Sequence, residues 1–138
     1  MIRHFKFLLM VIGSLFFVAC NGDSDSTDTS ASSLLEGKTF YSLEIDSSFY
    51  YSYKFSDGFV TTTSYDLTND SLDRVNDNAM EYTFSGNKMI SSKVGGDDKT
   101  THIVASTSNG VSLTDDANTS YIYYLYNTIA DAKSNPNK

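Results

Sequence analysis

Three observations predict that this chain forms an all-β domain of about eight short antiparallel strands. Apolar and polar residues alternate with a period of two in several segments beyond residue 38. The composition, with 10 Tyr, many Thr and 1 Pro, favours strands. Short turn sequences of Gly, Asn and Asp separate the alternating segments. Such a meander closes into a small up-and-down barrel, which removes exposed strand edges, although a β-sandwich is an open alternative.

The first strands have the clearest pattern. Asp57-Gly58 predicts a two-residue hairpin turn, because these residue types tolerate the positive φ that such a turn requires. Segment 59–67 returns from this turn, and segment 39–46 precedes the hairpin with the same alternation. The strand before the turn, 49–56, places four aromatic residues on one face: Phe49, Tyr51, Tyr53 and Phe55.

The later strands lie beyond a polar loop at 68–78 and are separated by glycine-containing turns. Residues 128–133 predict a short helical turn near the C-terminal end, and 131–138 predict a frayed end. The strands predicted after the loop are 80–84, 88–94, 100–106, 111–114 and 120–126.

The start of the predicted domain resembles that of lipocalin-like domains. Residues 35–41, LEGKTFY, place Gly37 and the aromatic Phe40 at the beginning of the first strand. Lipocalins carry Gly-x-Trp there, whereas Phe40 stands one position further on and the chain has no tryptophan. The resemblance implies a small eight-stranded barrel with a helical turn near its C-terminal end, and it implies no particular ligand.

Residues 1–19 predict a secretory signal peptide. Arg3 and Lys6 supply positive charge, an apolar segment of about a dozen residues follows, and Ala19 is a small residue at its end. The apolar segment is too short to cross about 30 Å of hydrocarbon comfortably.

The last residues of this segment with the next one, Phe17-Val18-Ala19-Cys20, resemble the lipobox of bacterial lipoproteins. In that family the cysteine receives a diacylglyceryl group before cleavage, which implies that Cys20 becomes the lipidated first residue and anchors the protein to a membrane. By resemblance to enteric bacterial lipoproteins, Asn21 implies the outer membrane. An ordinary signal peptide would leave Cys20, the only cysteine, as a lone thiol in an oxidising compartment.

The remainder divides into a tether and one domain. Residues 20–33 follow the lipidated cysteine with Ser, Thr and Asp and almost no apolar side chains, which predicts a disordered tether. Residues 34–138 then form a single β domain without an internal disulfide, and about 100 residues are enough for one hydrophobic core.

The chain is acidic, with 10 basic and 17 acidic side chains and a net charge of −7. Arg3 and Lys6 are lost with the signal peptide, so the exported chain is more acidic still. Such a surface repels nucleic-acid phosphates and anionic lipid headgroups. We therefore expect no nucleic-acid partner, and we expect the lipid on Cys20 to hold the protein at the membrane.

Residues for catalysis and for metal binding are scarce. Beyond the signal peptide His102 is the only histidine, and no nucleophile motif accompanies it, which favours a strand residue facing solvent or a polar neighbour. Zinc and copper sites need several Cys or His ligands. We therefore expect no enzyme activity, no metal and no cofactor. The acidic clusters that calcium would use are better explained as solvated turn residues: Asp70, Asp73 and Asp77, Asp97 with Asp98, and Asp115 with Asp116.

Tyrosines are the remaining candidates for binding. Inside a barrel they either fill the core or line a pocket that offers stacking and hydroxyl groups. The sequence favours a filled core on grounds of space. The candidate ligand-binding residues are Tyr51, Tyr53, Tyr65 and Tyr82, with Tyr121 and Tyr123 also predicted to point inward. The residues predicted to point outward, as a contact patch for another protein, are Tyr50, Tyr124 and Tyr126.

Two functions remain from these observations. The first is a non-catalytic, membrane-anchored envelope lipoprotein that serves as an interaction or structural module for another envelope protein. The alternative is a lipocalin-like carrier or sensor of a small apolar or aromatic ligand. The sequence favours the first, because it requires no cavity.

Overall fold

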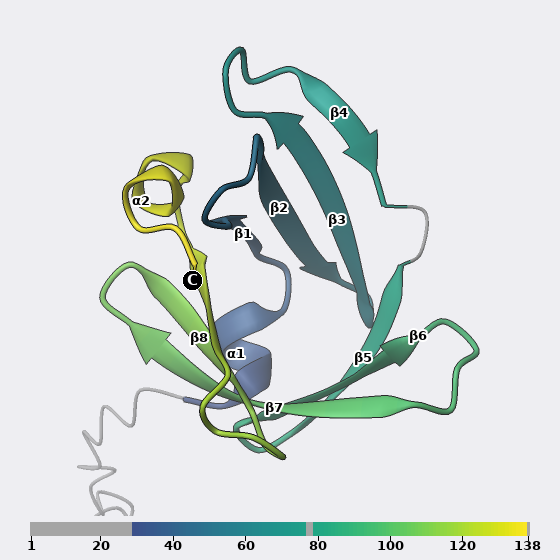
Figure 1. Cartoon of the computed structure of the whole chain (residues 1–138). Coiled ribbons are helices and arrows are strands. Elements are labelled where there is room, and N and C mark those ends of the chain that lie inside the picture. Colours follow the sequence, from purple (N-terminus) through teal and green to yellow (C-terminus); the bar gives the residue numbers. More distant parts are fainter. Residues whose placement is uncertain (1–28, 77–78, 138) are drawn as a thin grey trace, which may run out of the picture.

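The computed structural model describes residues 29–76 and 79–137, and it confirms the all-β prediction. Eight antiparallel strands form a closed barrel, to which a ninth strand and two short helices are added (Figure 1). Pairing between β2 and β3 joins the sheet into a ring, so the β-sandwich alternative is wrong. The strands are β1 (Thr39–Leu43), β2 (Phe49–Ser56), β3 (Phe59–Asp66), β4 (Leu72–Val75), β5 (Met80–Ser85), β6 (Lys88–Lys93), β7 (Lys99–Thr107), β8 (Gly110–Asp115) and β9 (Ile122–Tyr126).

The predicted hairpin turns set the order of the barrel. Asp57 and Gly58, between β2 and β3, have φ angles of 55° and 80°, which confirms a turn with positive φ at both central residues. The other barrel strands also follow one another up and down in sequence order. Along each strand, inward-facing and outward-facing side chains alternate.

Two joints of the barrel wall are short. Strands β1 and β9 pair at a single position, Tyr41↔Tyr126. Strands β3 and β5 pair at two positions, and the second of these is Val60↔Met80. After Val60, β5 no longer pairs with β3. The later residues of β3 pair with β4 instead, on the same side of the strand.

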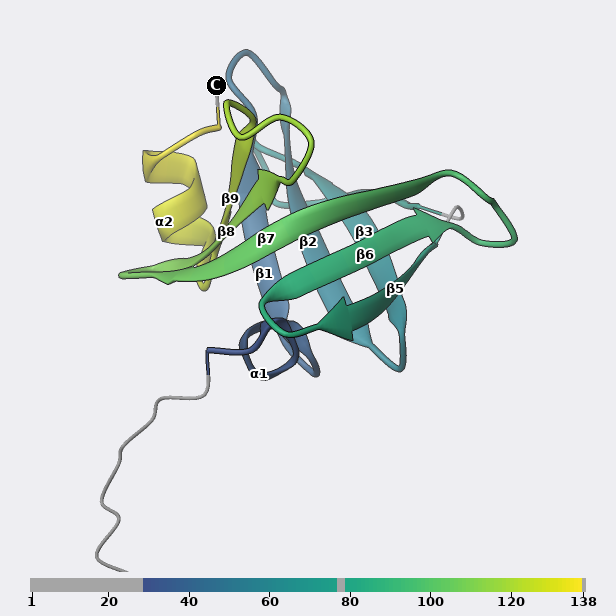
Figure 2. The same ribbon diagram turned by 90° about the horizontal axis from the view of Figure 1, so that it is seen from below.

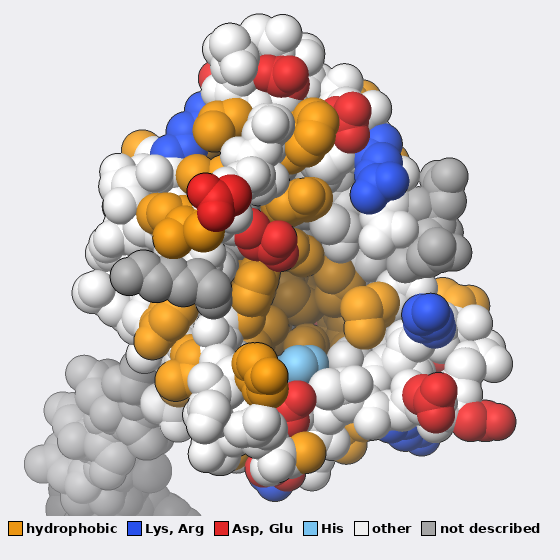
Figure 3. All heavy atoms as spheres, in the orientation of Figure 1, with side chains coloured by type: hydrophobic (Ala, Val, Ile, Leu, Met, Phe, Trp, Pro, Cys, Tyr) orange, Lys and Arg blue, Asp and Glu red, His pale blue; other side chains and the backbone are white. Residues whose placement is uncertain are grey.

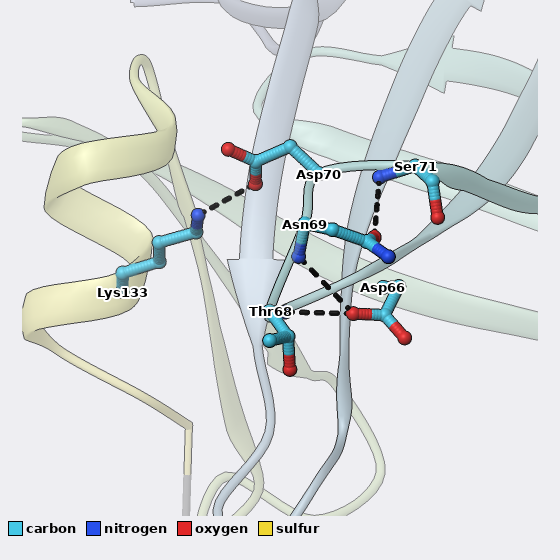
Figure 4. Close-up of polar contacts among 6 residues, drawn as sticks. All are labelled: Asp66, Thr68, Asn69, Asp70, Ser71 and Lys133. Carbon is cyan, nitrogen blue, oxygen red and sulfur yellow. Dashed lines mark hydrogen bonds and ion pairs between the residues drawn. The ribbon is translucent and has the colours of Figure 1, made fainter.

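Strand β4 corrects the prediction that 68–78 is a loop throughout. Its residues are all exposed, so they carry no buried alternation that would have revealed a strand. The turn before it is held by Asp66, whose Oδ1 accepts hydrogen bonds from the N–H groups of Thr68 at 2.7 Å and Asn69 at 3.3 Å (Figure 4). A side chain that bonds to the backbone just after it is a usual way to fix such a turn.

Helix α1 (Ala31–Leu35) lies across one end of the barrel (Figure 2). Ser30 caps it by accepting a hydrogen bond from the Ser33 N–H at 3.2 Å. Ala31 and Leu35, one helical turn apart, have no exposed surface and join the barrel core. The folded domain therefore includes residues 31–33, which were predicted to belong to the tether.

The core at this closed end is mostly aromatic. Phe40 and Phe55 meet edge to face at 6.0 Å, and Phe55 lies 5.7 Å from the ring of Tyr82. The Tyr82 hydroxyl donates a hydrogen bond to Glu36 Oε2 at 2.6 Å, and Glu36 Oε1 accepts from the Asp57 N–H at 3.0 Å. One carboxylate thus ties the end of α1 to the β2–β3 turn and to β5.

Helix α2 (Ile129–Ser134) confirms the predicted helical turn and packs outside the barrel against β1 and β9. Lys133 of this helix lies 2.7 Å from Asp70 Oδ1, in the turn before β4 (Figure 4). Its Nζ also lies 4.8 Å from the centre of the Tyr50 ring.

The prediction of a frayed C-terminal end is wrong. Asn137 is only 8% exposed, and its side chain binds the backbone of Tyr124 in both directions, at 2.8 and 2.9 Å. Its backbone donates to the Leu43 carbonyl and accepts from the Ile45 N–H. This residue therefore bridges β9 to the end of β1.

The signal peptide, Cys20 and the tether as far as residue 28 lie outside the described residues. In the parts of the chain that the structure describes, no helix is long and apolar enough to cross a membrane.

Candidate functional site

The barrel contains a cavity of about 350 Å³ that opens to solvent. Figure 3 shows a hollow in this face of the molecule whose walls are mainly hydrophobic, with a histidine beside it. The side chains that line it come from seven of the eight barrel strands and the turn before β9: Tyr53, Phe55, Val60, Thr62, Met80, Met89, Ser91, His102, Leu113, Asp115, Tyr121, Ile122, Tyr123 and Leu125.

Small residues on inward-facing positions leave this space free. Thr62 is paired with Tyr53, and Ser91 is paired with Tyr82, where larger apolar side chains would fill a barrel of this size. Ser42 and Ser64 are further buried serines on the inner faces of β1 and β3. The alternation of the strands therefore points polar and small groups as well as aromatic rings into the barrel.

Three hydroxyl groups on one wall are bonded to one another. The Tyr123 hydroxyl lies 2.8 Å from Ser42 Oγ and 3.1 Å from the Tyr53 hydroxyl, and the Ser42 and Tyr53 oxygens lie 3.5 Å apart. Burial is the main cause that raises the pKa of Tyr53 and of Tyr123 above the ordinary value. Both phenols are therefore neutral at physiological pH, and the three groups satisfy one another.

Ser91, on the β6 wall, has no such partner. It is 2% exposed, and within the described part of the chain its hydroxyl oxygen makes no hydrogen bond. A buried polar group left in this state costs about 1–3 kcal/mol, so native proteins rarely keep one without a use. The side chain belongs to the wall of the cavity, where a bound molecule is the available partner.

His102 lies on the same wall as Ser91. It is paired with Met89 across β6 and β7, and Ser91 is paired with Thr100, so the two side chains are diagonal neighbours on the inner face. No hydrogen bond joins the imidazole to another described residue. Desolvation by burial lowers the pKa of His102 below 6.5, and Asp115, its cross-strand partner on β8, partly offsets this.

The mouth of the cavity is formed by more exposed side chains. Tyr121 is 70% exposed, Ile122 44% and Met80 38%, yet all three also line the cavity. Tyr121 and Asp115 lie at the turn between β8 and β9, and the up-and-down order places this turn at the end of the barrel opposite α1. The barrel is therefore closed at one end and open toward the other.

A second hollow of about 300 Å³, polar in character, adjoins the cavity and shares Tyr53 and Thr62 with it. Its other lining residues are Glu44, Tyr51, Ser64, Arg74 and Asn76. Ser64 donates a hydrogen bond to Asp73 at 3.0 Å, so β4 also contributes to the polar groups of this hollow.

The structure separates the four tyrosines that the sequence had grouped. Tyr53 lines the apolar cavity, and Tyr51 lines the polar hollow with it. Tyr82 points inward but lies in the closed-end core, bonded to Glu36, and does not line the apolar cavity. Tyr65 lies on the outer face, where it stacks on Tyr50 at 5.1 Å, and Lys133 of α2 lies over the Tyr50 ring. The prediction that Tyr65 faces inward is therefore wrong.

Two of the polar lining residues, Ser91 and His102, were not singled out from the sequence as binding residues. Ser91 was not considered, and His102 was interpreted as a strand residue facing solvent or a polar neighbour. The alternation of Met89 and Ser91 within 88–94, and of His102 and Val104 within 100–106, was the available signal for their shared face. This alternation predicts which face of the strand these side chains share, but it does not predict whether side chains fill the barrel interior.

The acidic residues considered for calcium do not all lie in turns, because Asp73 belongs to β4 and Asp115 is the last residue of β8. Asp115 Oδ1 accepts hydrogen bonds from the N–H groups of Ala117 and Asn118, and Asp70 pairs with Lys133. Over residues 29–76 and 79–137, no group of three or more His, Cys, Asp and Glu side chains is placed to hold a metal ion. Asp77 lies outside that part of the chain.

The cavity has mainly apolar walls, and its polar lining groups include the imidazole of His102 and the hydroxyl of Ser91, the buried side-chain oxygen that has no hydrogen bond within the described residues. Comparison of the chain with protein-family models, with curated proteins and with solved structures finds no match.

Proposed function

We propose that this protein binds one small, largely apolar molecule inside its barrel and serves as a carrier or sensor for it. The observation that supports this most is the open cavity of about 350 Å³, because ligand sites of proteins have volumes of about 300–1,000 Å³ and mainly apolar walls. The sequence alone favoured an interaction module, for which a filled core suffices. An open cavity with an unpaired hydroxyl in its wall favours the carrier.

The lining residues support an apolar or aromatic ligand. Phe55, Tyr53 and Tyr123 offer ring faces and edges, while Met89 and Leu113 offer flexible and branched aliphatic surface. The resemblance of residues 35–41 to the start of lipocalin-like domains is in keeping with this proposal.

Filling the cavity tests the proposal. In Leu113→Trp, the larger ring occupies the space that the ligand needs, so binding is lost while the barrel keeps its stability. The matched control is Ser112→Trp, because Ser112 precedes Leu113 on β8 and faces the opposite side of the strand. Both are made in residues 21–138, which contain every element of the barrel.

Native mass spectrometry of these proteins from bacterial extract supplies the measurement. We expect an added mass on the wild-type protein and on Ser112→Trp that disappears on denaturation, and none on Leu113→Trp. An adduct of equal abundance on Leu113→Trp, or a bare mass for all three proteins even after incubation with a naphthalene-based fluorescent probe, contradicts the proposal.

We further propose that the carrier is exported and held in the outer membrane by lipid on Cys20, with residues 21–29 as its tether. The support is the order of charged, apolar and small residues before the single cysteine. In Cys20→Ser, we expect loss of labelled palmitate and release from the membrane fraction. Retention of both in that variant contradicts the proposed anchor.

A further inference from the structure

Two sets of buried polar groups lie at or next to the cavity wall. The first is the cluster of Ser42, Tyr53 and Tyr123, whose hydroxyl groups bond to one another at 2.8–3.5 Å. The second is the pair of Ser91 and His102 on β6 and β7. Ser91 Oγ is the buried side-chain oxygen that has no hydrogen bond within the described residues, so a polar group of the ligand gains most by binding at this second set.

Ser91 and His102 together fix the kind of group that they can bind. A serine hydroxyl donates one hydrogen bond and accepts others, and a neutral imidazole has one donor and one acceptor nitrogen. A ligand hydroxyl uses both abilities, and a ligand carbonyl accepts from both residues. An entirely apolar ligand would leave the Ser91 hydroxyl, which is 2% exposed, without a partner.

The charges around this pair favour an uncharged ligand. Asp115 faces His102 from β8 and also lines the cavity, so a carboxylate or phosphate placed at this wall meets a like charge. The chain as a whole carries a net charge of −7, which adds to the repulsion of an anion. A cation would lose its hydration in the largely apolar cavity, where Asp115 is the single lining carboxylate and its Oδ1 already accepts two backbone hydrogen bonds.

We infer that the cavity selects an uncharged apolar molecule carrying a single hydroxyl or carbonyl group, and that Ser91 and His102 bind this group. The inference rests on the proposed function and specifies the ligand class of the same cavity. It makes the β6–β7 wall the polar end of the site, while the aromatic side chains of β2 and β9 contact the apolar body of the ligand.

Four probes with one naphthalene skeleton test this selection: 2-naphthol, 2-methylnaphthalene, 2-naphthoate and 2-naphthylmethylammonium. Their dissociation constants are measured by fluorescence titration at pH 7.5 with residues 21–138. We expect 2-naphthol to bind about fivefold to tenfold more tightly than 2-methylnaphthalene, which has nearly its shape but no hydrogen bond to offer. The two charged probes should bind more weakly than 2-naphthol.

The variant Ser91→Ala identifies the group responsible. It removes an unpaired buried hydroxyl, so the barrel should fold as before, and it should abolish the preference for 2-naphthol while leaving 2-methylnaphthalene unaffected. Ser92→Ala is the control, because Ser92 is the next residue of β6 and faces the other side. His102→Phe should reduce the same preference in part.

The outcomes separate the two proposals. If no probe binds the wild-type protein, the proposed function itself fails. If 2-methylnaphthalene binds as tightly as 2-naphthol, or if Ser91→Ala behaves like Ser92→Ala, the cavity binds apolar molecules but the inferred selection is wrong. Tightest binding of the naphthoate or of the ammonium probe also overturns it, since the wall would then select charge.

Discussion

The two short joints of the barrel wall differ in whether another segment supplies hydrogen-bond partners to both of their strands. Strands β1 and β9 share one paired position, and β3 and β5 share two, so both joints leave backbone groups without a neighbouring strand. At the first joint, Asn137 supplies the missing partners for β1 and for Tyr124. At the second joint β4 satisfies one side of β3, and the cavity reaches the wall there through Val60, Thr62 and Met80.

The difference shows how one barrel can be sealed on one side and open on the other. A third segment placed between two diverging strands closes the wall, whereas a segment that pairs with only one of them leaves a gap. Helix α2 adds cover to the sealed joint, because it packs against both β1 and β9. The open joint lies next to the apolar lining, because Val60, Thr62 and Met80 line the cavity at this side.

The largest effect should come from breaking the sealed joint with Asn137→Ala. The substitution removes both side-chain hydrogen bonds to Tyr124 and leaves the backbone N–H and carbonyl of Tyr124 unpaired in a partly buried place. The free energy of unfolding should therefore fall by about 2–3 kcal/mol. Urea denaturation measures the change. Asn135→Ala, which removes an exposed bond to the Asp131 carbonyl, is the control and should cost less than about 1 kcal/mol.

An unfolding free energy for Asn137→Ala equal to that of Asn135→Ala would show that the C-terminal residues do not seal the barrel. The comparison of the two joints would then rest on α2 alone. Binding of 2-naphthol to Asn137→Ala sharpens the comparison further, because a second opening should speed dissociation without changing the residues that line the cavity.

The sequence predicted the fold well because its signals are local. Alternation within each strand and the positive-φ turn at Asp57 and Gly58 are properties of neighbouring residues, and both were confirmed. The features that it missed depend on distant partners. Strand β4 is exposed along its whole length, and Asn137 is bound to residues far from it in sequence, so neither carries a local hydrophobic pattern.

The cavity could not be predicted for a related reason. Period-two alternation tells which residues face inward, and it correctly placed Tyr51, Tyr53 and Tyr82 on that side. Whether inward residues fill a barrel depends on the sum of side-chain volumes around the whole ring, including small residues such as Ser91. Tyr65 was placed wrongly because a ring on the outer face can also be covered, in this case by stacking on Tyr50 under α2.

A smaller effect should come from His102 in the cavity wall, whose protonation makes the stability of the protein depend on pH. Burial lowers the pKa of His102 below its ordinary value of 6.5, so between the two values the unfolded chain binds more protons than the folded one. Stability should therefore be full above pH 6.5 and decline as the pH falls toward the folded-state pKa of His102. In His102→Gln this part of the decline should be absent, while the titration of carboxylates at lower pH remains.

The melting temperature of the two proteins between pH 7.5 and pH 5 provides the measurement. Asp115 is the acidic group that faces His102, and by stabilising the imidazolium it keeps the expected loss below that of Asn137→Ala. Parallel curves for wild type and His102→Gln would mean that the histidine stays hydrated through the open joint. A steeper decline that 2-naphthol at saturating concentration increases would place the neutral imidazole in contact with the bound ligand, because binding then favours the unprotonated form.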